Sequence, residues 1–251
     1  MDEREYEIMY RIEDGFWWYR GLHGWLRAEL ARARTGPVFA HLDAGCGTGR
    51  LLSLCDDHFT FGIDFSEHAL AFTRRRGRFP LARASVTALP FCDGAFDAVT
   101  SADVLSEVGS PGDEAALAEF ARVLKPGGRV ILNLPAYAWL ASRHDAAVNT
   151  RRRYRAGEVA ALLAQAGFTV RTLTYRLCAL LPPIALVRLA GRIRASAEAP
   201  RSDLEPAPRA IDALLSHYLQ LENRILACGG RLPFGLSVSA VGEKAGAKFR
   251  L

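Results

Sequence analysis

A glycine-rich segment, Gly45-Cys46-Gly47-Thr48-Gly49, separates an apolar run from a stretch with helical spacing. Glycines in such a strand-to-helix turn let the backbone approach a ligand closely and present N–H groups at the positive end of a helix. The spacing is G-x-G-x-G, with Arg50 where the dinucleotide fingerprint has Gly or Ala, and the phosphate-loop pattern is absent. The turn alone therefore predicts close ligand binding without naming the ligand.

Asp64 ends the next apolar run, nineteen residues after Gly45. In doubly wound sheets, a carboxylate at this place can accept hydrogen bonds from both hydroxyls of a ribose. The turn and the acid together predict a ligand that contains a ribose. The alternative is an α/β sheet whose turns need glycine for purely structural reasons.

Five ordered segments within residues 38–136 resemble the motifs of class I S-adenosylmethionine-dependent methyltransferases: LDAGCGTG, GIDFS, ASVTALPF, FDAVTSADVL and LKPGGRVILNLP. The resemblance implies S-adenosylmethionine as cofactor and S-adenosylhomocysteine as product. It implies that the methionine part is surrounded by Asp43, Gly45, Cys46 and Gly47, and that Asp64 holds the ribose. It also implies that Phe65, Ser85 and Val86 contact the adenine and that Ala102 lines the pocket.

Glu107 and His144 are the candidate catalytic groups. Glu107 stands where relatives often have histidine, and a carboxylate over a water-poor cleft can have a pKa near neutrality that suits a general base. A solvated loop residue is the alternative for Glu107. His144 belongs to a segment that resembles the H-D-x-x-x-x-H-x-R-R-Y element of a methyltransferase subgroup and also contains Arg153 and Tyr154. We expect these three residues in the substrate pocket; the alternative is a solvated basic loop.

Trp17, Trp18 and Tyr19 resemble the W-W-[FY] element of the same subgroup. One interpretation is an aromatic lid over the methyl donor, with Trp18 and Tyr19 contacting substrate. The other is a helix docked on the sheet through its large rings. The two interpretations are compatible.

Short apolar runs alternate with helical stretches after residue 37, which is typical of βαβ units and a parallel sheet. We expect strands at 38–44, 60–64, 81–86, 96–102, 128–134, 168–175 and 236–243, and helices at 48–55, 66–76, 113–124, 156–166 and 210–227. The predicted fold is a doubly wound, seven-stranded, mostly parallel Rossmann-like sheet. The resemblance implies the strand order 3-2-1-4-5-7-6, with the last strand antiparallel.

The predicted organisation has four parts: a two-helix N-terminal cap (1–36), a cofactor-binding core (37–176), a lid insertion (177–235) with a flexible linker at 195–209, and a returning final strand (236–251). Residues 177–194 are apolar and punctuated by arginines. They suit a lid helix over the substrate, which we favour, or a helix on a membrane surface.

The composition, with 50% hydrophobic and 24% charged residues, is typical of a soluble globular chain. Five isolated cysteines without C-x-x-C spacing favour a reducing cytoplasm over a disulfide framework. No metal-ligand spacing is present, and the basic residues form no long stripe interleaved with aromatics, so we expect neither a metal nor a nucleic-acid partner.

The sequence thus predicts a methyltransferase that transfers a methyl group to a small-molecule acceptor by in-line displacement. Three alternatives stay open. The first is a methyltransferase of lipid-linked or polyprenyl substrates at a membrane surface. The second is a binding module that holds the cofactor and transfers nothing. The third is an enzyme of this fold that uses the bound sulfonium electrostatically for another reaction.

Overall fold

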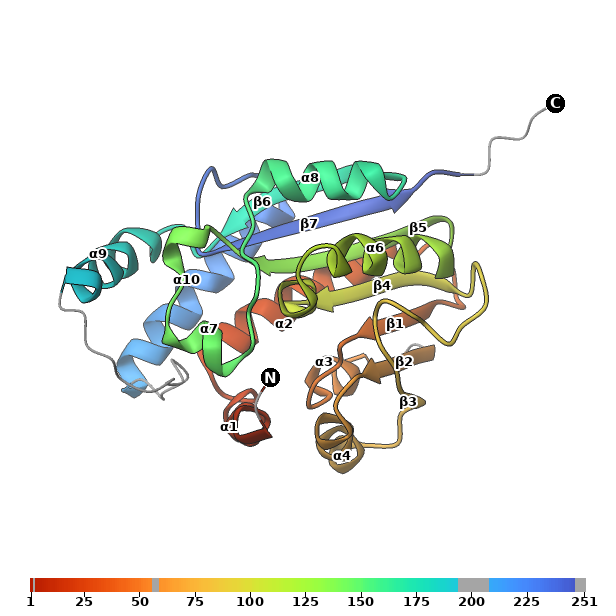
Figure 1. The fold of residues 1–251 in the computed structure, drawn as a ribbon, viewed down its shortest axis with the longest axis horizontal. Coiled ribbons are helices and arrows are strands. Elements are labelled where there is room, and N and C mark those ends of the chain that lie inside the picture. Colours follow the sequence, from red (N-terminus) through yellow and green to blue (C-terminus); the bar gives the residue numbers. More distant parts are fainter. Residues whose placement is uncertain (2, 56–58, 194–207, 247–251) are drawn as a thin grey trace.

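A computed structural model describes residues 1, 3–55, 59–193 and 208–246. Seven strands form one sheet in the order β3-β2-β1-β4-β5-β7-β6 (Figure 1). β7 runs antiparallel to both of its neighbours, and the other pairs are parallel. The predicted strand order and the antiparallel last strand are confirmed. The strands are β1 (Ala40–Ala44), β2 (Phe59–Asp64), β3 (Leu81–Arg83), β4 (Phe96–Ala102), β5 (Leu124–Pro135), β6 (Phe168–Arg176) and β7 (Ser237–Lys244).

Helices cover both faces of the sheet (Figure 1). They are α1 (Glu3–Ile12), α2 (Trp17–Ala33), α3 (Arg50–Ser53), α4 (Glu67–Arg76), α5 (Val104–Val108), α6 (Gly112–Val123), α7 (Arg143–Ala147), α8 (Ala156–Gln165), α9 (Leu181–Ile193) and α10 (Arg209–Ala227), with a 3-10 turn η1 (Ala138–Leu140). The predicted pair of N-terminal helices is confirmed as α1 and α2. α10, far away in sequence, packs along α2, and Leu219 lies directly against Gly21.

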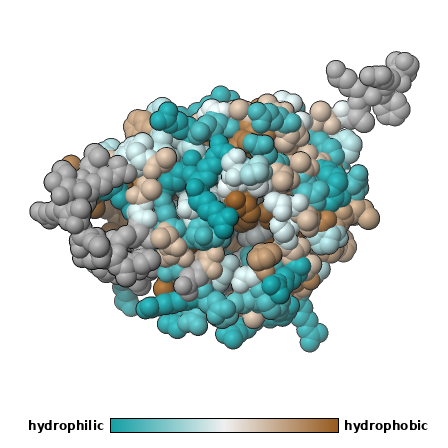
Figure 2. All heavy atoms as spheres, viewed as in Figure 1, coloured by the Kyte–Doolittle hydropathy of each residue, from teal (hydrophilic) through white to brown (hydrophobic). Residues whose placement is uncertain are grey.

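The core has two main parts, one on each face, because successive side chains of a strand point to opposite sides. On β4 and β5, Val99, Val130 and Leu132 join the cluster that includes α6 and α8 residues, whereas Ala98 and Ile131 join the cluster under α2. The sheet is therefore buried on both faces, as expected for a mostly parallel sheet. On the face shown in Figure 2, hydrophilic and hydrophobic residues are interspersed.

Several predicted boundaries were wrong. β5 starts at Leu124 instead of residue 128, because its first residues already pair with β4 across an irregular register. β3 ends at Arg83 instead of 86, and the helix expected at 48–55 is only α3. The short helices α5 and α7 were not predicted. Most of the expected linker 195–209 lies outside the described residues, as do residues 56–58.

Candidate functional site

A cavity of about 890 Å³ lies at the carboxyl ends of the parallel strands, where doubly wound sheets bind ligands. The turn after β1 and the ends of β2 and β4 form one side of it, and α1, α2 and α9 contribute the rest together with the loop after β5. Fourteen of the fifteen side chains or glycines predicted for the site line this cavity: Asp43, Gly45, Cys46, Gly47, Asp64, Phe65, Ser85, Val86, Ala102, Trp18, Tyr19, Glu107, His144 and Arg153.

The turn after β1 is fixed to β2 by its backbone. Gly45, Gly47 and Gly49 have φ values of 87°, 54° and 80°, in the left-handed region that glycine tolerates best. The N–H groups of Gly45 and Cys46 both donate to the carbonyl oxygen of Ile63, at 2.9 and 2.8 Å. A Cβ on Gly45 would collide with the side chain of Val104, so this turn and the start of α5 are in close contact.

Asp64 connects the turn to the end of β2. One carboxylate oxygen accepts the N–H of Gly47 and the other accepts the N–H of Ser66, each at 2.9 Å. The side chain is buried, and burial raises the pKa of Asp64 while these two hydrogen bonds lower it. Each oxygen accepts one of these N–H groups and keeps a further lone pair for a ligand hydroxyl.

Asp43 lies in β1, two residues before Gly45. Its carboxylate accepts a hydrogen bond of 2.8 Å from the hydroxyl of Thr100 in β4. Burial raises the pKa of Asp43 to about 7, against the lowering effect of this hydrogen bond. Burial also raises the pKa of the Cys46 thiol, which packs with Leu52 and Leu70 as an apolar side chain. Cys46 therefore serves as part of an apolar wall.

Phe65, Ser85 and Val86 form another part of the cavity wall, which combines an exposed ring with a hydroxyl. Phe65 is 72% exposed, and the Arg83 guanidinium lies 5.8 Å from its ring centroid. Ser85 shares a 2.8 Å hydrogen bond with the hydroxyl of Thr87, and Val86 beside it is buried. An apolar ring face next to a few polar groups suits a flat heterocycle such as adenine.

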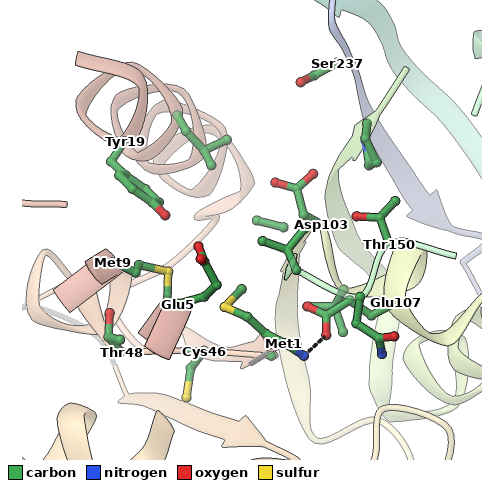
Figure 3. A pocket seen from close by; sticks show the side chains of 18 of the residues that line it. Met1, Glu5, Met9, Tyr19, Cys46, Thr48, Asp103, Glu107, Thr150 and Ser237 are labelled. Carbon is green, nitrogen blue, oxygen red and sulfur yellow. Dashed lines mark hydrogen bonds and ion pairs between the residues drawn. The ribbon is translucent and has the colours of Figure 1, made fainter. Parts of the chain in front are cut away.

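Glu107 accepts a hydrogen bond of 3.0 Å from the α-ammonium of Met1 (Figure 3). Burial raises the pKa of Glu107, and this ammonium lowers it. The side chain is therefore paired in the structure.

Asp103 also lines the cavity, and sequence reasoning missed it (Figure 3). It is the first residue after β4, and its φ of 62° is unusual for a residue with a side chain. The amide of Asn133 donates to its carboxylate oxygens at 3.3 and 3.4 Å. Burial raises the pKa of Asp103 to about 7. Its place just past a parallel strand, like that of Asp64 at the end of β2, was the available signal in the sequence.

Arg153 and Tyr154 have largely structural contacts. Arg153 binds both carboxylate oxygens of Asp145, at 2.6 and 2.7 Å, and also donates to the carbonyl oxygen of Ala136 at 3.0 Å. Tyr154 is fully buried outside the cavity lining, and its hydroxyl lies 3.0 Å from both the carbonyl oxygen of Leu105 and a carboxylate oxygen of Asp113. His144, on α7, lines the cavity beside Asp145.

The aromatic residues at the start of α2 contribute to both core and cavity. Trp18 is half-buried, packs against the cluster beneath α2 and lines the cavity. Tyr19 is buried, stacks with His23 at 6.0 Å between ring centroids and lines the same cavity. The two interpretations of this element are compatible with this arrangement.

The N-terminal helices are tied to the glycine turn by a buried ion pair that the sequence did not reveal. Arg76 at the end of α4 lies 2.7 Å from Glu13 and donates to the carbonyl oxygen of Thr48 at 3.0 Å. Glu13 also accepts a hydrogen bond from the Thr48 hydroxyl. Both ion-pair partners are nearly inaccessible to solvent.

The residues at the β1–β2 end of the cavity fit an adenosyl ligand. Asp64 has acceptor capacity for two hydroxyls, Phe65 and Val86 offer apolar surface, and the turn has no room for side chains at its glycines. A Cβ on Gly49, for example, would come within 2.5 Å of the Thr73 side chain. Among the described residues, no three His, Cys, Asp or Glu side chains come together as metal ligands. No helix in the described part of the chain could cross a membrane.

Comparison with known proteins finds similarity to methyltransferases. Residues 42–132 match the family model described as a methyltransferase domain. The chain is 38% identical over 174 residues to an uncharacterized protein of Mycobacterium tuberculosis, a match that covers 65% of this chain and 58% of that protein. It is 36% identical over 144 residues to the ubiquinone/menaquinone biosynthesis C-methyltransferase UbiE of Methylobacterium nodulans, covering 51% of this chain and 54% of that protein.

The chain thus spans somewhat more than half the length of these relatives. Among solved structures, geranyl diphosphate C-methyltransferase from Streptomyces coelicolor A3(2), in complex with Mg²⁺, geranyl diphosphate and S-adenosylhomocysteine, aligns with a TM-score of 0.56. The identity is 18%, and the alignment covers 88% of this chain and 79% of that one. That likeness concerns the fold. Residues 42–132 thus match a methyltransferase domain, and the chain shares the Rossmann-like fold of a methyltransferase whose complex contains S-adenosylhomocysteine.

Proposed function

We propose that the chain is an S-adenosylmethionine-dependent methyltransferase that acts on a small-molecule acceptor by in-line displacement. One observation carries the proposal. A cavity of about 890 Å³ contains the predicted cofactor residues and also extends to side chains of α2, α9 and the start of β7. A cavity of this size is at the upper end for small-molecule sites. It gives an acceptor a place beside the cofactor.

The residues of the β1–β2 end have defined roles in this proposal. Asp64 would hold the ribose hydroxyls, Phe65, Ser85 and Val86 would contact adenine, and the glycine turn would contact the methionine part. When bound, S-adenosylmethionine supplies a methyl group already activated by its sulfonium. The protein then has to hold a nucleophile in line with the methyl carbon, and such positioning can lower a barrier by about 7–11 kcal/mol.

The cavity is also lined by residues outside the predicted cofactor set, among them the polar Arg188 and Ser237. Its apolar lining includes Trp18 and Leu22 of α2 and Ile184 of α9. We assign these side chains to acceptor binding and to the exclusion of water, together with Tyr19. His144 and Glu107 are proposed to bind polar groups of the acceptor, and Arg153 is proposed to shape the pocket by holding Asp145. Tyr154 has no place in the proposed site.

Two measurements test the proposal. Calorimetry should show heat of binding with S-adenosylmethionine and with S-adenosylhomocysteine. Protein with methyl-labelled donor should then transfer label to members of a panel of phenols, hydroxyquinones, amines and aliphatic alcohols, and the product should carry the mass of one added methyl group. Binding without transfer to any member would favour a non-enzymatic module. A converted product without the added mass would indicate a non-methylating reaction.

A lipid-linked acceptor at a membrane surface is the second candidate. The observation that favours it is on α9, where Leu186 and Val187 are 71% and 70% exposed. The UbiE relative, by its name, is a C-methyltransferase of ubiquinone and menaquinone biosynthesis. Flotation with anionic liposomes tests this candidate. If it is correct, the wild-type protein floats and the variant with Leu186→Glu and Val187→Glu does not; if the wild-type protein stays at the bottom, the candidate is excluded.

A further inference from the structure

The backbone at Asp103 is held in an uncommon conformation. Its φ of 62° is costly for a residue with a side chain, and such strain collects at functional sites. Two hydrogen bonds maintain it: the Asp103 N–H donates to the carbonyl oxygen of Asn133 at 2.7 Å, and the Ser106 hydroxyl donates to the Asp103 carbonyl oxygen. The position of the Asp103 side chain is therefore defined by the ends of both β4 and β5.

This side chain lies between the two ends of the cavity. Figure 3 shows Asp103 between Cys46 of the glycine turn and Ser237 at the start of β7. The next residue, Val104, packs onto Gly45 so closely that a Cβ there would not fit. Asp103 is thus adjacent to the turn assigned to the methionine part of the cofactor, on the side that faces the proposed acceptor space.

The charged groups around Asp103 are mostly engaged elsewhere. Arg153 binds Asp145, and Arg176 of β6 donates to the carbonyl oxygen of Gly21 and to Asn223. Both cations lower the pKa of Asp103 from a distance, whereas Glu107 of α5 raises it. The Tyr19 hydroxyl of α2 is close enough for Asp103 to raise its pKa, after the larger effect of burial. Within the described residues, the carboxylate itself receives hydrogen bonds only from Asn133, and these are long.

We propose that Asp103 is the acid–base group of this site and that the acceptor is an apolar molecule bearing a hydroxyl or amine N–H. The inference rests on the proposed function. The acceptor oxygen or nitrogen uses a lone pair to bond the methyl carbon, and the carbon–sulfur bond breaks with its electron pair going to sulfur. The acceptor proton goes to the Asp103 carboxylate and then to solvent.

The electrostatics of the site support this role. With a pKa of about 7, Asp103 is partly protonated in the cofactor-free protein. A sulfonium placed beside it favours the ionised carboxylate, because an opposite charge nearby lowers the pKa of an acid. Entry of S-adenosylmethionine should therefore release a proton and leave a base ready for the acceptor. S-adenosylhomocysteine has a neutral sulfur and should release no proton from Asp103, so a release common to both ligands belongs to other groups such as Asp43.

The apolar surroundings indicate the acceptor class. The apolar residues Trp18, Leu22, Leu177, Ile184 and Leu236 line the cavity, and its polar lining includes Asp103, His144, Arg188 and Ser237. A pocket of this kind binds an apolar body and uses few polar groups to orient it. A carbon acceptor that loses no proton on methylation would leave Asp103 without a function in turnover.

Proton release on binding is the primary test, because it needs no acceptor. Calorimetry in buffers of different ionisation enthalpy, at pH 7, should show that S-adenosylmethionine releases about half a proton more per bound molecule than S-adenosylhomocysteine, since a group with a pKa near the working pH is about half protonated. The comparison is needed because Asp43, whose pKa is also about 7, faces the methionine part that both ligands contain. The release should increase at pH 6. Asp103→Asn should bind the cofactor and lose this release, and Asp103→Glu should retain it. Asp93→Asn, at a surface carboxylate 81% exposed, is the matched control and should behave as wild type.

The outcomes separate the inference from the proposed function. If neither ligand binds the wild-type protein, the proposed function fails first. If S-adenosylmethionine releases no more protons than S-adenosylhomocysteine, or if Asp103→Asn shows the same difference as wild type, Asp103 is not the acid–base group. With the most active phenol or amine of the panel, Asp103→Asn should lower kcat by 10²- to 10⁴-fold, the usual contribution of general base catalysis, and should remove the acidic limb of the pH profile. An unchanged kcat and profile would overturn the proposal.

Discussion

Replacing Asp64 by asparagine should weaken the binding of S-adenosylmethionine and S-adenosylhomocysteine equally, because both contain the ribose. In the structure each Asp64 oxygen already accepts one backbone N–H, from Gly47 and from Ser66. The amide cannot accept at both positions, so either a ribose hydroxyl or a backbone N–H loses its acceptor. A hydrogen bond to a charged group contributes about 1.5–3 kcal/mol, which corresponds to a rise in Kd of about 10- to 150-fold.

Calorimetry with S-adenosylhomocysteine measures this loss directly, and urea unfolding separates it from a loss of fold. We expect Asp64→Asn to unfold cooperatively with a free energy of unfolding lower by about 1–3 kcal/mol, because one buried N–H faces the amide group. Asp93→Asn serves as the control for removal of one surface carboxylate. If Asp64→Asn binds S-adenosylhomocysteine within twofold of the wild-type protein, the assignment of Asp64 to the ribose is refuted.

Three further variants test other parts of the site. Gly45→Ala should lower the free energy of unfolding and abolish measurable cofactor binding, because the φ of 87° and the Val104 side chain both oppose a Cβ; Val104→Ala in the same chain should recover part of the stability. Tyr154→Phe should lower the free energy of unfolding by about 1–2 kcal/mol, because the hydrogen bonds of the hydroxyl, one of them to Asp113, are lost. Calorimetry should show an unchanged affinity for S-adenosylhomocysteine, and weaker binding would mean that Tyr154 belongs to the binding site. Burial lowers the pKa of His23 to about 4, below its value of about 6.5 in the unfolded chain. Between pH 6.5 and pH 4 the unfolded chain therefore binds one more proton at His23 than the folded chain, and the free energy of unfolding falls as the pH drops through this range. In urea titrations His23→Gln should show a shallower fall, and an equal slope would contradict the buried neutral imidazole.

The sheet and the cofactor turn were predictable because their signals are local. The glycines after β1 and the acid ending β2 stand in short segments whose spacing fixes their roles, and the alternation of apolar runs with helices fixes the layers. The hydrogen-bond and ion-pair partners of the site residues, by contrast, could not be predicted from local spacing. Arg153 lines the cavity, and its substrate contact stays a prediction. Its ion pair with Asp145, eight residues earlier, was not predictable, because nothing in the basic run 151–155 distinguishes it from its neighbours. Glu107 was chosen by analogy with relatives and Asp103 was not considered, although the structure pairs Glu107 with an ammonium.

The contact between the N-terminal helices and the glycine turn has a consequence for cofactor exchange. Arg76 bridges Glu13, in the turn between α1 and α2, and the carbonyl oxygen of Thr48. Separating this buried pair would leave an uncompensated charge, at a cost of about 3–5 kcal/mol. We therefore expect the α1–α2 turn to stay docked on the glycine turn while the cofactor is exchanged. Access for exchange is then expected at the ends of these helices, where α1 begins beside Glu107 and α2 meets α10.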